Sequence, residues 1–119
     1  MTLDTFTTAF IEAALWSSTD ESTPEGDEPM DANYTVTDFA PETLERMQAD
    51  CASFQLQHWE DIQDDVSLAG HDFWLTRNGH GAGFWDGDWP VRVGEKLTDA
   101  SHRCGEVNLY IGDDGRIYS

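Results

Sequence analysis

Residues Ala69–Asp88 read A-G-H-D-F-W-L-T-R-N-G-H-G-A-G-F-W-D-G-D, and we predict the fold from this stretch outward. His71–Arg77 alternates in polarity and is rich in aromatic residues, which is typical of a strand. Asn78–Gly81 is a turn cluster, and Ala82–Asp86 has the character of a returning strand. The stretch therefore predicts a β-hairpin with a long glycine-rich connection at the centre of the fold.

Two helices are predicted before this hairpin. Residues 3–16 place apolar side chains three and four positions apart, and Asp4 or Thr5 can cap the first turn. Pro41 favours the first position of a second helix, which we expect to end at Gly70 and to have a break near Gln57 and His58. The predicted buried stripe of that helix comprises Leu44, Met47, Cys51 and Phe54.

The chain after the hairpin predicts one more helix and one more hairpin. We expect a helix over Val91–Arg103, a strand over Glu106–Ile111, an Asp-Gly turn at Gly112–Gly115 and a pairing strand at Arg116–Tyr118. The predicted fold class is α+β. N-terminal helices would pack on an antiparallel sheet of three or four strands, with one helix inserted between the hairpins. We expect residues 1–119 to form a single domain, with an irregular acidic loop over residues 17–33.

Charge is the strongest compositional signal. The chain has 24 acidic and 6 basic residues, a formal net charge of −18, and no Lys or Arg before Arg46. Such a field repels nucleic acids, phosphates and anionic membranes, so we expect no direct binding to nucleic acid. The partners that it favours are cations and the basic surfaces of other proteins.

Targeting and redox features are sparse. No apolar run is long enough to cross a membrane, and the N-terminal residues lack the basic and apolar regions of a signal peptide. Cys51 and Cys104 are too few for a disulfide scaffold, so we expect two reduced thiols, with a bridge between them as the alternative. Together these features predict a cytoplasmic protein with no membrane contact.

No motif assigns catalysis, a cofactor or a metal. The histidines and cysteines lack the short spacings of zinc sites, and G-H-G-A-G lacks the Lys-Ser/Thr that ends a phosphate-binding loop. Asp86 and Asp88 flank Gly87 in a way that is ordinary for a turn, although paired carboxylates also occur in glycosidases. We therefore expect a protein that is not an enzyme and that has no cofactor.

Three segments resemble a known group of proteins. They are T-F-T-T-A-F-I-E-A-A-L-W-S-S-T-D (residues 5–20), A-G-H-D-F-W-L-T-R-N-G-H-G-A-G-F-W-D (residues 69–86) and L-Y-I-G-D-D-G-R-I-Y (residues 109–118). In these segments the chain resembles a family of small uncharacterised bacteriophage and mobile-element proteins. The resemblance implies a phage-related setting inside a bacterial host cell, and it implies no catalytic residues.

The function that we predict is binding through surface carboxylates. A compact domain whose carboxylates are spaced like phosphates can occupy the Lys/Arg array of a nucleic-acid-binding protein. The hypothesis is a phage-encoded inhibitor of a host defence or nucleic-acid-binding complex, of the anti-CRISPR or anti-restriction type, that acts as a DNA mimic. The candidate partner-binding residues are Asp20, Glu21, Glu25, Asp27, Glu28, Asp31, Glu42, Glu45, Glu60, Asp61, Asp64 and Asp65.

Two alternatives stay open. The excess of Asp over Glu and of Arg over Lys is also typical of proteins adapted to salt, and the function would then lie elsewhere. A small enzyme or ligand-binding protein would instead use the predicted hairpin. Its candidate residues are His71, Asp72, Arg77, His80 and Asp86.

Overall fold

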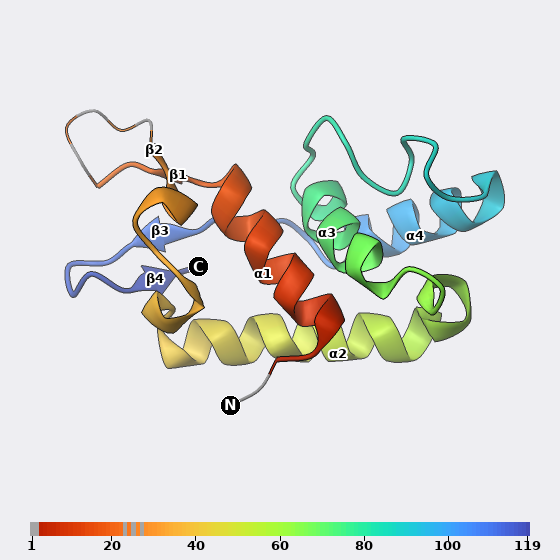
Figure 1. The fold of residues 1–119 in the computed structure, drawn as a ribbon, viewed down its shortest axis with the longest axis horizontal. Coiled ribbons are helices and arrows are strands. Elements are labelled where there is room, and N and C mark those ends of the chain that lie inside the picture. Colours follow the sequence, from red (N-terminus) through yellow and green to blue (C-terminus); the bar gives the residue numbers. More distant parts are fainter. Residues whose placement is uncertain (1–2, 23, 25, 27) are drawn as a thin grey trace.

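The computed structural model describes residues 3–22, 24, 26 and 28–119. Helices account for most of its regular structure (Figure 1). The helices are α1 (Thr5–Ser17), α2 (Pro41–Ile62), α3 (Val66–Arg77) and α4 (Val91–Arg103), with short 3-10 helices η1 (Met30–Ala32) and η2 (Val36–Asp38). The strands are β1 (Thr19–Asp20), β2 (Glu28–Pro29), β3 (Tyr110–Ile111) and β4 (Ile117–Tyr118).

The molecule is elongated, with principal extents of 43 × 30 × 21 Å. Helix α2 follows the long axis and α1 crosses over it (Figure 1). Helices α3 and α4 lie toward one end, and the two hairpins lie toward the other. No helix in the described part of the chain combines the length and the apolar character needed to cross a membrane.

The first two helices begin as the sequence predicts. The carboxylate of Asp4 accepts a hydrogen bond from the backbone N–H of Thr7 at 2.8 Å, which caps α1. Pro41 occupies the start of α2, and the predicted break is confirmed at His58, whose φ of −124° and ψ of 17° are not helical. Cys51 is buried in the predicted stripe and Cys104 is exposed; both are free thiols.

The strand predicted at His71–Arg77 is wrong, because these residues belong to α3. Helix α2 ends at Ile62, and Asp65 starts α3 by accepting a hydrogen bond from the backbone N–H of Leu68 at 3.4 Å. Nearly every residue of α3 from Ala69 onward is buried. A helix that is buried on all sides has no polar face, so its sequence lacks the helical period and resembles a buried strand.

The returning strand predicted at Ala82–Asp86 is also wrong. These residues form an irregular loop that folds back onto α3. The hydroxyl of Thr76 accepts a hydrogen bond from the backbone N–H of Phe84 at 3.1 Å. The Phe84 ring is buried and lies 5.8 Å from that of Phe54, so this aromatic segment fills the helical core instead of a sheet face.

The predicted sheet of three or four strands is replaced by two separate antiparallel pairs. Strand β1 pairs with β2, and β3 pairs with β4. The Asp-Gly turn is confirmed, since the N–H of Gly112 donates to the carbonyl of Arg116 at 2.8 Å. The helix predicted over Val91–Arg103 is confirmed as α4, so the coarse class of helices with small antiparallel hairpins holds.

Five phenylalanines from four segments of the chain form the centre of the core: Phe6, Phe10, Phe54, Phe73 and Phe84. The ring centroids of Phe54 and Phe73 lie 4.1 Å apart, and those of Phe10 and Phe73 lie 5.2 Å apart. Each such pair contributes about 0.5–1.5 kcal/mol beyond the burial of its area. The cluster joins α1, α2, α3 and the loop before α4 into one core.

Helices α1 and α3 cross closely at Gly70. A Cβ built on Gly70 would overlap the backbone carbonyl oxygen of Phe6 and would lie 3.2 Å from the Cβ of Ala9. Gly70 thus lies inside α3 and does not end a helix as predicted. Its role is to let the backbones of two helices approach each other.

We predict that Gly70→Ala lowers the free energy of unfolding by about 2–3 kcal/mol, because the added methyl group forces the two helices apart. Urea denaturation followed by circular dichroism measures the change. Gly81→Ala is the matched control, since nothing lies within 4 Å of its added Cβ. An equal effect of the two substitutions would contradict the close crossing.

Candidate functional site

The surface carries a large excess of unpaired negative charge. Among the acidic residues that the structure describes, most are exposed, and only Asp20 and Asp72 are buried. Three ion pairs are found within the described residues. They are Arg77–Asp50 at 3.0 Å, Lys96–Asp61 at 2.7 Å and Arg116–Asp114 at 4.0 Å.

The candidate acids on and beside α2 form two groups at its two ends. Glu42 and Glu45 are exposed on its first turns, and we call them the amino-end group. Glu60, Asp64 and Asp65 are exposed around its last turn and the connection to α3, and we call them the carboxyl-end group. At 1.5 Å per residue, Glu42 and Glu60 lie about 27 Å apart along the helix.

The middle of α2 separates the two groups. Asp50 is the one acidic residue between Glu45 and Glu60, and its carboxylate binds the guanidinium of Arg77. Asp61, another candidate, is half-buried and binds Lys96. The candidate carboxylates on α2 therefore do not form one continuous row.

The candidate acids of the loop before α2 have different environments. Glu21, Glu28 and Asp31 are exposed, and Glu28 accepts a hydrogen bond from the side chain of Asn33 at 2.8 Å. Asp20 is buried, and its carboxylate accepts from the backbone and hydroxyl of Ser22. Asp20 therefore does not belong to the surface that a partner could reach. Glu25 and Asp27 lie outside the described residues.

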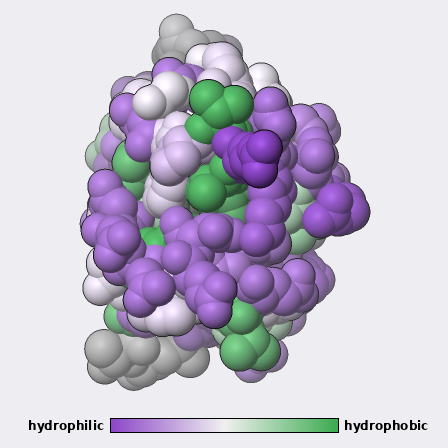
Figure 2. All heavy atoms as spheres, turned by 90° about the vertical axis from the view of Figure 1, so that its right-hand side faces the viewer, coloured by the Kyte–Doolittle hydropathy of each residue, from purple (hydrophilic) through white to green (hydrophobic). Residues whose placement is uncertain are grey.

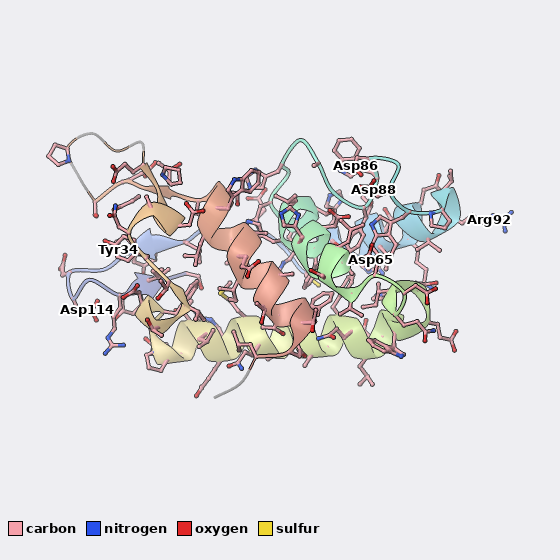
Figure 3. The ribbon with its side chains drawn as sticks, viewed as in Figure 1. Tyr34, Asp65, Asp86, Asp88, Arg92 and Asp114 are labelled. Atoms are coloured by element: carbon pink, nitrogen blue, oxygen red, sulfur yellow. The ribbon has the colours of Figure 1, made fainter. Side chains whose placement is uncertain are left out.

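Two further acids lie at the same end of the molecule as the carboxyl-end group. Asp86 and Asp88 are exposed on the loop between α3 and α4, and Asp65 lies at the start of α3 (Figure 3). Arg92 lies at the tip of α4 and points away from them. The face that looks out from this end is mostly hydrophilic, with a small hydrophobic patch (Figure 2).

Arg77, one of the residues proposed for an enzyme, makes structural contacts within the fold. Arg77 is buried, and its guanidinium donates to the carbonyls of Gly105 at 2.8 Å and Cys104 at 3.1 Å as well as to Asp50. These bonds tie α3 to α2 and to the end of α4. Among the described residues, no group of three or more His, Cys, Asp or Glu side chains is arranged to hold a metal ion.

Asp72, another residue proposed for an enzyme, is a buried carboxylate. Its Oδ2 accepts a hydrogen bond from the indole N–H of Trp89 at 2.8 Å. Burial raises the pKa of Asp72 to about 6, and the carboxylates of Asp86 and Asp88 act in the same direction. Trp89 and the nearby His71 oppose this rise in pKa without cancelling it.

Comparisons with protein-family models, with curated proteins and with solved structures found no match to this chain.

We predict that Asp72→Asn raises the free energy of unfolding at pH 7.5 by about 1–2 kcal/mol. This gain is smaller than the one that the full difference between the folded and unfolded pKa values would give, because polar surroundings screen the charge. The folded pKa lies above the unfolded value of 3.8, so protonation stabilises the native protein below pH 3.8, and this gain is lost as the pH rises through about 6. The advantage of Asn should therefore shrink between pH 6 and pH 4.

Chemical denaturation across this pH range tests the Asp72 prediction. Glu12→Gln is the control, because it removes one negative charge from an exposed site. Parallel pH profiles for Asp72→Asn and the unmodified protein would show that Asp72 titrates normally.

Proposed function

We propose that this chain is a phage-encoded acidic binding protein that acts in the bacterial cytoplasm. Its partner is the basic surface of a host defence or nucleic-acid-binding complex, which it occupies in place of nucleic acid. In this proposal the chain is an inhibitor of the anti-CRISPR or anti-restriction type that acts as a DNA mimic. The observation that carries the proposal is the exposed, unpaired negative charge over the described surface.

The placement of the cations supports this proposal. Arg77 is buried among backbone carbonyls and Asp50, and Lys96 binds Asp61. These two cations therefore do little to offset the field of the other acids. A surface of one sign raises the association rate with an oppositely charged partner and disfavours partners of like charge.

The distance between the two acid groups sets the length of the basic surface that they could contact together. The separation of about 27 Å between Glu42 and Glu60 equals the rise of about eight base pairs of duplex DNA. A nucleic-acid-binding surface of that length presents Lys and Arg side chains to phosphates at both ends. The amino-end and carboxyl-end groups can meet the two ends of such an array at once.

The proposal is a binding function and not catalysis. Arg77, a member of the proposed enzyme set, has all of its described contacts within the fold. The carboxylate of Asp72 is covered by the protein and binds Trp89. Neither side chain is presented to a ligand.

We predict that the immobilised protein retains a basic nucleic-acid-binding complex from a bacterial host lysate, and that added duplex DNA or RNA displaces it. Retention should fall steeply as salt rises, because the contacts are electrostatic. Mass spectrometry identifies the retained proteins. Retention of nothing basic, or of proteins that nucleic acid does not displace, would contradict mimicry.

Matched charge variants locate the surface. The test variant carries Glu42→Gln, Glu45→Gln and Asp64→Asn, and we expect it to bind the retained complex about tenfold more weakly. The control carries Glu12→Gln, Glu95→Gln and Asp99→Asn, which change the net charge equally at exposed sites outside the candidate set. Equal losses of affinity would mean that only total charge matters.

We also predict that the protein is folded at about 20 mM salt, where surface charges are least screened. The aromatic core and the separation of the two acid groups favour this outcome. Circular dichroism and urea denaturation at low and molar salt measure it. A chain that folds only in molar salt would favour salt adaptation as the origin of the charge.

A further inference from the structure

A groove separates the two hairpins of the fold. One wall is formed by residues 17–19, 21 and 22, the other by residues 107–111, and its volume is about 570 Å³. Trp74, Asn78 and His80 also line it. This groove contains none of the α2 acids, so it is separate from the amino-end and carboxyl-end groups.

Strand β3 presents an open backbone edge. In an antiparallel pair, the backbone N–H and C=O groups of successive residues point alternately toward the partner strand and away from it. Gly112 donates to Arg116 across the turn, so Tyr110 also faces β4, whereas Leu109 and Ile111 direct their N–H and C=O groups to the opposite side. Leu109 and Ile111 both line the groove.

Strand β1 presents a second open edge by the same rule. The N–H of Met30 donates to the carbonyl of Ser18 at 2.9 Å, so Ser18 faces β2. Thr19 is the next residue and stands opposite Pro29, which has no N–H to donate. The N–H and C=O of Thr19 therefore point away from β2, and Thr19 also lines the groove.

We propose that an extended segment of a partner protein binds in this groove as an added strand. Its backbone would pair with Thr19 on one side and with Leu109 and Ile111 on the other, joining the two ladders into a single five-stranded sheet. Strand addition of this kind gains affinity from backbone hydrogen bonds and specificity from alternate side chains. It also covers two edges that are otherwise available for pairing.

The chemistry of the groove specifies a basic and apolar segment. Successive side chains of a strand point to opposite faces, so every second residue would face the groove residues Trp74 and Val107 and the others would face solvent. Glu21 lines the groove, Glu106 adjoins it in sequence, and no Lys or Arg is among its lining residues. The favoured occupant alternates Val, Ile or Leu with Lys or Arg.

This inference deepens the proposed function and rests on it for the identity of the partner. The acids would attract a basic partner over a distance, and the groove would hold one of its extended segments. The backbone geometry of β1 and β3 does not depend on which protein supplies that segment.

The test uses the full chain and a capped hexapeptide of alternating lysine and valine. We expect binding to slow amide hydrogen exchange, measured by NMR, about tenfold at Thr19, Leu109 and Ile111. Tyr110 and Gly112 face β4 already, so their amide exchange should change little. Saturable binding without slower amide exchange at Thr19, Leu109 and Ile111 would overturn the proposal.

The control peptide has the same sequence and charge but carries N-methyl groups on its valines. We expect it to bind about tenfold more weakly, because it lacks backbone donors on one edge. Equal affinity of the two peptides would show attraction by charge alone and would overturn strand addition. Slower exchange at Thr19 and Ile111 with rising protein concentration, without peptide, would assign the groove to a second copy of this chain and would also overturn the proposal.

The two proposals fail separately. The peptide could protect the groove amides while no nucleic-acid-binding complex is retained. That result would support strand addition in the groove and would contradict the proposed function. Retention of such a complex with no protection of these amides would reject the groove as the binding site for an extended segment and keep the proposed function.

Discussion

The close crossing of α1 and α3 at Gly70 sets the arrangement of the other elements. The carbonyl of Phe6 occupies the space that a side chain at position 70 would fill, so the two helices meet backbone to backbone. This brings the rings of Phe6 and Phe10 onto Phe73. Helix α2 adds Phe54, and the loop before α4 adds Phe84. One missing side chain thereby positions an aromatic core that draws on most of the chain.

That core has to form against the self-repulsion of a chain with a net charge of −18. The fold limits this cost by keeping most of the described acids at the surface, where water and salt screen their charges. It also places Arg77 against the carbonyls at the end of α4 and beside Asp50. The C-terminal end of a helix carries partial negative charge, which favours a cation. Because this cation acts inside the fold, it leaves the surface field strongly negative.

The surface has two features suited to binding, and they act over different distances. The exposed carboxylates act at long range and without fixed geometry, which governs encounter and the choice of partner by charge. The open edges of β1 and β3 act only at hydrogen-bond distance and require an extended backbone in a given register. A partner that satisfied both would be basic overall and would contain a segment free to extend.

Several features of the structure were determined by local sequence or composition alone. The cap at Asp4, the start of α2 at Pro41, the Asp-Gly turn of the last hairpin and the surface excess of acid all follow from neighbouring residues or from composition. The helix over His71–Arg77 did not, because burial on every side removes the polar face from which a helix is recognised. The burial of Asp20 and Asp72 and the open edges across the groove were decided only by tertiary structure. Each depends on which distant segments pack together, and a linear pattern carries no information about that.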